Sequence, residues 1–157
     1  MYARILAPID GSSTSNRGLM EAINLAKDQK AKVRLLHVVD ESFLVFDTYG
    51  MLSWNSVTQA LREGGERLLA EAKSLAARSG VDVEGAMVET LQQRVADKIL
   101  NEAREWRADL IVMGTHGRRG FGHLVLGSDA ETVLHDAPVP VLLIKAVSAE
   151  DRPEASA

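Results

Sequence analysis

The chain has 157 residues, of which 46% are hydrophobic and 25% charged, and these proportions suit one soluble globular domain with a sizeable core. The formal net charge of −4 argues against non-specific nucleic-acid binding, which requires a basic face, and the lack of cysteine excludes disulfides, thiolate zinc sites and cysteine nucleophiles. No apolar run approaches membrane-span length and no signal-peptide pattern opens the chain, so we expect a cytoplasmic protein without membrane insertion.

The N-terminal part of the chain has the pattern of a βαβ unit. Residues 5–9 form a short, continuously apolar run, which predicts a strand in a sheet covered on both faces. Pro8 is expected near the end of this strand, because proline cannot donate to a sheet ladder. A turn follows, in which Ser12 or Ser13 is expected to cap a helix. Residues 33–39 predict a second strand, parallel to the first.

Residues 42–60 lack regular periodicity but hold four of the seven aromatic residues of the chain. A solvated linker would not be this aromatic. One interpretation is a loop or short helix packed over an end of the sheet. The other is a lid over a ligand or a surface for a partner chain.

The middle of the chain predicts a long helix followed by an edge strand. Apolar residues recur at helical spacing from residue 61 to a natural stop at Gly80. Gly64 and Gly65 disfavour helix, so either the helix begins after them or another segment packs closely against them. Residues 81–88 alternate between apolar and polar, which indicates a strand at a sheet edge.

The rest of the chain continues the alternation of strands and helices. An apolar stripe from Val95 to Trp106 predicts a third helix, with the indole of Trp106 in the core. Residues 110–113 predict a fourth strand. A fourth helix is expected to end at Pro138, and residues 139–144 predict a fifth strand.

Strictly alternating elements predict an α/β fold with a doubly wound, open five-stranded parallel sheet and helices on both faces. We expect it to occupy residues 1–147 as one domain, with residues 148–157 as a disordered tail. Sheets of this kind bind ligands at the carboxyl ends of strands, where the winding reverses. These ends are formed here by Pro8 to Gly11, His37 to Asp40, and Met113 with Gly114.

The segment from Leu110 to Ser128 joins an apolar strand to a helix start through a loop rich in glycine, with arginines at 118 and 119. Backbone N–H groups can approach a phosphate where no Cβ intervenes, and the dipole of a helix favours negative charge at its start. The segment therefore predicts an anion site. No Gly-Lys-Ser/Thr closes the loop and the first strand–helix turn lacks the dinucleotide fingerprint, so neither common phosphate loop fits.

The chain resembles the universal stress protein family over nearly its whole length. In the ATP-binding branch of that family a G-x2-G-x9-G-S/T motif holds the nucleotide, and this chain carries the motif. The residues that carry the resemblance are Ile5 to Ser12, Leu36 to Val39, Ala108 to Gly117, Gly127 to Glu131 and Ala137 to Val141.

The resemblance implies contacts with the nucleotide, residue by residue. The alternative for the first of these residues, Asp10, is a simple Asx turn into the first helix. Carried over by position, with Pro8 at the same strand end, the binding residues are Asp10 and Val38 for adenine and ribose, Met113 and Gly114 for ribose and the first phosphate, and Gly117, Gly127 and Ser128 for the phosphates.

The glycine-rich loop and its surroundings also contain basic side chains, for which the family resemblance implies no role. Arg118 and Arg119 could pair with the β- or γ-phosphate, the alternative being a solvated loop face. His116 and His123 flank the loop and could supply charge near neutral pH, whereas His37 is expected to be a hydrogen-bonded core histidine.

Asp129 departs from the family pattern, in which a small or apolar residue follows Gly127 and Ser128. A carboxylate in the first helical turn suits the helix dipole but repels a phosphate held at the same helix start. Three alternatives follow: the side chain points away from the phosphate, it reaches a phosphate-bound Mg²⁺ or Mn²⁺, or it weakens binding. We expect the first.

The resemblance also implies the sheet order 3-2-1-4-5 and a homodimer in which the strands at Val139–Ile144 pair across a two-fold axis. An open apolar edge strand has an independent physical reason to be paired.

Three functions are compatible with the sequence. The leading hypothesis is a dimeric sensor or adaptor in stress regulation that binds ATP, or AMP or ADP, with Mg or Mn, and signals through an unknown protein partner. The second is a slow ATPase that uses the arginines and a metal, although no nucleophile–base pair demands chemistry. The third is an interaction module that binds no nucleotide.

Overall fold

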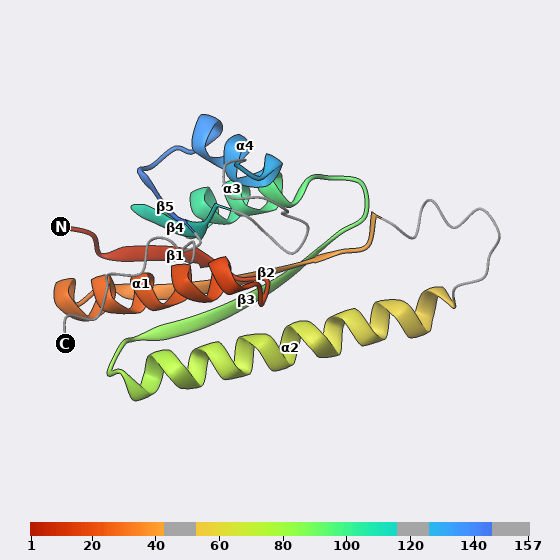
Figure 1. Ribbon diagram of the computed structural model, residues 1–157, viewed down its shortest axis with the longest axis horizontal. Helices are drawn as coiled ribbons and strands as arrows, with labels where there is room; N and C mark the ends of the chain where they lie inside the picture. The colour runs from red at the N-terminus through yellow and green to blue at the C-terminus, as the bar shows by residue number, and fades with distance from the viewer. Residues whose placement is uncertain (43–52, 116–125, 146–157) are drawn as a thin grey trace, which may run out of the picture.

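The computed structural model describes residues 1–42, 53–115 and 126–145, in which strands and helices alternate around one parallel sheet. The strand order is β3-β2-β1-β4-β5, and every neighbouring pair is parallel (Figure 1), which confirms the predicted fold class and order. Within these ranges no helix is both long and apolar enough to cross a membrane. The elements are β1 (Arg4–Pro8), α1 (Ser13–Gln29), β2 (Lys32–Asp40), α2 (Trp54–Arg78), β3 (Val83–Thr90), α3 (Val95–Glu105), β4 (Leu110–Gly114), α4 (Ser128–Asp136) and β5 (Val141–Ile144).

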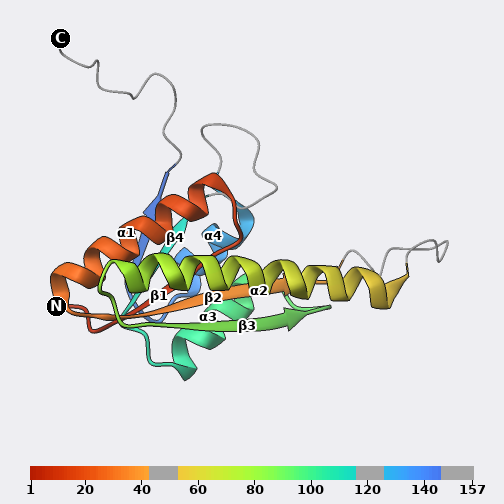
Figure 2. The same ribbon diagram turned by 90° about the horizontal axis from the view of Figure 1, so that it is seen from below.

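The helices form one layer on each face of the sheet (Figure 2). α1 and α2 pack against one set of strand side chains, which includes Ile5 and Leu35. α3 and α4 pack against the opposite set, which includes Leu6, Leu36 and Ile111. Successive strand residues point to opposite faces, so the continuous apolar runs of the sequence serve both cores.

α2 is longer than the sequence pattern predicts. It begins at Trp54 rather than near residue 61, so residues 54–60, which were expected to be a loop or short helix, are its first turns. These turns are mostly exposed, with Trp54 itself 46% exposed, and an exposed helix shows little apolar periodicity. Residues 43–52 lie outside the described residues, so the choice between a packed loop and a lid or partner surface stays open.

Gly64 and Gly65 lie inside α2, and close packing explains Gly65. A Cβ atom there would lie 2.5 Å from Cδ2 of His37 and 2.9 Å from Sδ of Met87. The ring of His37 is held in place, because its Nδ1 donates to the carbonyl oxygen of Ile9 at 2.9 Å. Of the two alternatives that the sequence left open, close packing is therefore confirmed for Gly65, although a glycine inside a helix costs about 1 kcal/mol relative to alanine.

The strand bounds differ slightly from those predicted. β5 begins at Val141 rather than at residue 139, because Pro138 and Pro140 have no N–H to donate and interrupt the ladder. β3 lies at the sheet edge, as predicted. The predicted tail at residues 148–157 lies outside the described residues, so the tail and the domain limit at residue 147 stay predictions.

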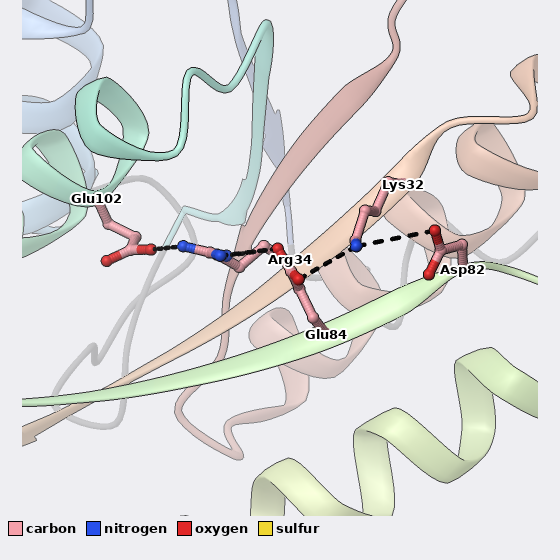
Figure 3. Close-up of polar contacts among 5 residues, drawn as sticks. All are labelled: Lys32, Arg34, Asp82, Glu84 and Glu102. Carbon is pink, nitrogen blue, oxygen red and sulfur yellow. Dashed lines mark hydrogen bonds and ion pairs between the residues drawn. The ribbon is translucent and has the colours of Figure 1, made fainter.

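A chain of ion pairs links β2, β3 and α3 (Figure 3). Nζ of Lys32 lies 3.2 Å from a carboxylate oxygen of Glu84 and 3.9 Å from one of Asp82. The guanidinium of Arg34 lies 2.8 Å from the carboxylate of Glu84 on β3 and 2.5 Å from that of Glu102 on α3. Glu102 is almost buried, so Arg34 compensates a charge that would otherwise be costly inside the protein.

Trp106 lies directly after α3 and is 5% exposed, which confirms its predicted place in the core. Two guanidinium groups face its ring: Cζ of Arg4 is 4.6 Å and Cζ of Arg34 is 5.0 Å from the ring centroid. These distances allow cation–π attraction. The indole therefore joins the ion-pair chain to the apolar core on the α3 side of the sheet.

We expect Glu84→Gln to lower the free energy of unfolding at neutral pH and to reduce its dependence on acid pH. Burial by itself raises the pKa of the Glu84 carboxyl, but hydrogen bonds and charges from Lys32 and Arg34 outweigh burial and hold the pKa below its ordinary value of 4.5. The stabilisation is then complete above the unfolded-state pKa and is lost as the pH falls through the lower folded-state pKa.

Urea unfolding of both proteins at neutral pH and at a series of acid pH values measures this effect. If the curves of unfolding free energy against pH for wild type and Glu84→Gln stay parallel below pH 4.5, the prediction is wrong.

Candidate functional site

A cavity of about 610 Å³ opens at the carboxyl ends of β1, β2 and β4. This volume lies within the range of roughly 300–1,000 Å³ for small-molecule sites, and the location is the one expected for ligands of open parallel sheets. Three predicted residues, Gly117, Arg118 and Arg119, lie outside the described residues, as do His116 and His123. The predicted residues that line the cavity are Pro8, Asp10, Val38, Met113, Gly114, Gly127 and Ser128.

The turn between β1 and α1 forms one wall of the cavity. Oδ1 of Asp10 accepts the Ser12 N–H at 2.9 Å, and Oγ of Ser12 accepts the Ser15 N–H at 3.2 Å as the cap of α1. The Asp10 N–H in turn donates to Oγ of Ser15 at 3.0 Å. The Asx turn that the sequence raised as an alternative for Asp10 is thus present, and it fixes this side chain at the cavity wall.

Gly114 ends β4 where the start of α1 comes very close. A Cβ atom there would lie 2.8 Å from the carbonyl carbon of Thr14 and 3.0 Å from the backbone nitrogen of Ser15. Backbone atoms cannot move aside as a flexible side chain can. This position therefore requires glycine for the packing of α1 on β4, whether or not a ligand is bound.

The N-terminus of α4 forms the opposite wall. The Gly127 N–H donates to the carbonyl oxygen of Thr115 at 2.9 Å, which ties the helix start to the end of β4. Within the described residues no side chain caps α4, in contrast to Ser12 on α1. Backbone N–H groups in the first turn of a helix attract anions, so this end of the cavity suits a phosphate or carboxylate.

Asp129 lies in the first turn of α4 and also lines the cavity. Its Oδ1 accepts the Ala96 N–H at 3.1 Å, in the first turn of α3. The carboxylate is thus held by the N-terminus of a second helix. Because Asp129 also lines the cavity, the first of the three alternatives from the sequence stays a prediction. The bond joins α3 to α4 beside the cavity and satisfies an N–H that lacks a partner within its own helix.

His37 is 6% exposed, and because Ile9 offers only a carbonyl oxygen, Nδ1 of His37 carries the proton of their hydrogen bond. The predicted hydrogen-bonded core histidine is confirmed. His37 also lines the cavity, at the strand end where the sequence predicted the ligand site, although the sequence assigned it no contact with the ligand.

The wall formed by α2 was missed in the sequence. Ala60, Leu61, Gly64 and Gly65 line the cavity from this helix. The consecutive glycines inside a helical pattern indicated close packing at this place, but they did not indicate a cavity. His37, which approaches Gly65, is far away in sequence.

We expect Asp129→Ala to lower the free energy of unfolding by about 1 kcal/mol, the usual cost of removing a side-chain cap from a helix N-terminus. Thermal or urea unfolding measures this loss, and Asp129→Asn, which keeps an oxygen acceptor, is the matched control. Because the side chain is engaged by α3, the same variant should not tighten nucleotide binding tenfold; such a gain would show that the carboxylate faces the ligand.

The chain is similar to known proteins over most of its length. A family model described as the universal stress protein family matches residues 1–145. The universal stress protein MJ0531 of Methanocaldococcus jannaschii is 38% identical over 146 residues, which cover 92% of this chain and 83% of that protein. A crystal structure of a protein of the same family from Burkholderia pseudomallei is 38% identical, has a TM-score of 0.77, and aligns over 92% of this chain and 97% of its own.

A more distant structure, the universal stress protein from Archaeoglobus fulgidus in complex with dAMP, shares the fold with a TM-score of 0.65 at 24% identity, over 92% of this chain and 98% of its own. The family match spans both layers and every described strand of the sheet. The chain therefore belongs to the universal stress protein family.

Proposed function

We propose that the protein binds an adenine nucleotide, with ATP as the principal ligand, in the cavity at the carboxyl edge of the sheet. One observation carries the proposal: a cavity of about 610 Å³ joins the N-terminus of α4, which no described side chain caps, to a wall of apolar residues on α2. A nucleotide needs this combination, an anion site at one end and an apolar surface for the base at the other. The A. fulgidus relative bound to dAMP supports the choice of ligand.

In this proposal the residues divide along the nucleotide. The N–H groups at the start of α4, beginning with that of Ser128, hold the phosphates together with Gly117, Arg118 and Arg119. The N–H of Gly127 is bound to Thr115, so Gly127 contributes by leaving room beside the helix start, because it has no side chain. Magnesium or manganese arrives with ATP and is bound through the phosphates, as is usual for Mg²⁺ at nucleotide sites. The remaining contacts, with ribose and base, come from Pro8, Asp10, Val38, Met113 and Gly114, all of which line the cavity.

We further propose that the nucleotide acts as a signal that the protein passes to a partner, in the manner of a sensor or adaptor. The cavity is lined by residues of β1, β2, β4 and all four helices, so a ligand there contacts both layers of the fold. Binding energy from such contacts can favour one arrangement of the layers over another.

The variant Ser128→Pro tests the phosphate site directly. Ser128 is the first residue of α4, where proline is tolerated, and Gly127 before it has φ −63 and ψ 147, a conformation that suits a residue preceding proline. The substitution removes one N–H from the anion site and leaves the helix in place. We expect ATP affinity to fall about tenfold, equivalent to about 1.4 kcal/mol.

Isothermal titration calorimetry with ATP, ADP and AMP measures these affinities. Ser128→Ala is the matched control, because it removes the hydroxyl and keeps the N–H. If wild-type protein binds none of the three at millimolar concentration, the proposed function is wrong. If Ser128→Pro binds ATP as well as wild type does, the phosphates do not lie at α4.

We also propose that the protein forms a homodimer through β5, the strand predicted at Val139–Ile144. The described sheet ends at β5, and all four of its residues, Val141–Ile144, are only half-buried. The carbonyl oxygens of Pro140 and Ile144 point toward β4, where they accept hydrogen bonds from the N–H groups of Ile111 and Thr115. Because backbone groups alternate in direction along a strand, those of Val141 and Leu143 point outward and can pair with a second copy.

We expect Leu143→Pro to convert this dimer into a monomer, because it removes an outward N–H and spares the groups bonded to β4. Sedimentation velocity at micromolar concentration measures the oligomeric state, and circular dichroism checks that the variant is folded. A wild-type protein that sediments as a monomer would show the dimer proposal to be wrong.

A further inference from the structure

Gly64 is a glycine for which the packing of the described residues gives no reason. A Cβ atom at this position would meet only Nη2 of Arg67, the far end of a flexible side chain, at 4.0 Å. Its neighbour Gly65 differs, because His37 and Met87 already occupy the space beside it. Alanine at position 64 would fit and would favour the helix. Gly64 therefore leaves a helix surface without a side chain, and no packing within the described residues requires this.

The bare surface faces the cavity. Gly64 and Ala60, one helical turn apart, both line it, whereas Arg62 on the other flank of α2 is bound to Glu89 of β3. Arg67 is exposed and does not line the cavity. The flank of α2 that contains Ala60 and Gly64 thus presents backbone and one methyl group to the cavity, with Leu61 beside them.

This wall suits a flat apolar group and not a phosphate. Its cavity-lining residues, Ala60, Leu61, Gly64 and Gly65, carry no charge. α2 and α4 pack on opposite faces of the sheet and line the same cavity, so a nucleotide with its phosphates at α4 can reach α2 with its other end. The part of the ligand that arrives there is its base.

We infer that Gly64 forms part of the binding surface for the base, because the purine ring lies against the α2 backbone at this residue and a side chain there would occupy the place of the ring. The inference rests on the proposed nucleotide site and adds a base-recognition wall on α2 to it. A ring against an exposed helix backbone loses its water on one face, and any atom beyond Cα at position 64 competes for that space.

Three variants test the inference. Gly64→Ala and Gly64→Leu add side chains of increasing size at the wall. Ala70→Leu adds the larger one to an exposed position of the same helix that does not line the cavity. Urea unfolding without ligand shows whether each variant is folded, and we expect Gly64→Ala to unfold at a higher urea concentration than wild type. Titration calorimetry with ATP, ADP and AMP then gives the affinities.

We expect Gly64→Leu to weaken binding at least tenfold, and by the same factor for every nucleotide that wild type binds, because these ligands share the base and differ only in phosphates. Gly64→Ala should weaken binding by a smaller factor, although it stabilises the unliganded protein, and Ala70→Leu should bind as wild type does. Should Gly64→Leu not fold, the opposite effects of Gly64→Ala on stability and on affinity decide the question.

Two results would overturn the inference while the proposed function stands. In the first, wild type and both Gly64 variants bind nucleotides with equal affinity. In the second, the Gly64 variants lose affinity for ATP but not for AMP, which would place the phosphates at α2. Failure of wild type to bind any nucleotide would instead overturn the proposed function, and the inference with it.

Discussion

The close approach of α1 to the end of β4 is the constraint on which the candidate site depends. Gly18 of α1 and Gly114 of β4 face each other: a Cβ on Gly18 would lie 3.2 Å from the Gly114 nitrogen, and one on Gly114 would lie 2.8 Å from the Thr14 carbonyl carbon. This contact brings the turn at Asp10 beside the strand end. Thr115, the next residue, accepts the Gly127 N–H, so the start of α4 is anchored to the same point.

The ion-pair chain and the candidate site lie at different ends of the sheet. Lys32, Arg34 and Glu84 lie in the first halves of β2 and β3, where they join α3 and Trp106 into one ionic and aromatic cluster. The cavity lies at the opposite, carboxyl ends of the strands. Within the described residues the site can therefore leave the start of α4 without a side-chain cap and one flank of α2 without a side chain at Gly64, while the rest of the fold provides stability.

Asp129 shows how a residue that looks unfavourable in sequence can be accommodated. A carboxylate beside a phosphate site repels the ligand if it is free to face it. Here Ala96 in the first turn of α3 engages one oxygen, and the N-terminus of that helix attracts the charge. The same carboxylate thereby couples the two helices that cover one face of the sheet.

The sequence by itself determined the fold class, the sheet order through its family resemblance, and the place of the cavity. The fold class could be predicted because it depends on local signals: apolar runs for buried strands, Pro8 at a strand end, and a serine cap at Ser12 before α1. The place of the cavity then follows, because sheets of this class bind ligands at the carboxyl ends of their strands. The glycine motif led to Gly114, Gly127 and Ser128 at the cavity, although Gly117, Arg118 and Arg119 lie outside the described residues.

Only the tertiary structure decided the features that depend on contacts between distant segments. The need for glycine at position 65 comes from His37, which is held by Ile9, and neither residue is near Gly65 in sequence. The direction of Asp129 depends on α3, and the length of α2 exceeds what an exposed helix reveals through periodicity. A local pattern encodes the preference of a segment for helix or strand, whereas the walls of a cavity are set by which segments the fold brings together.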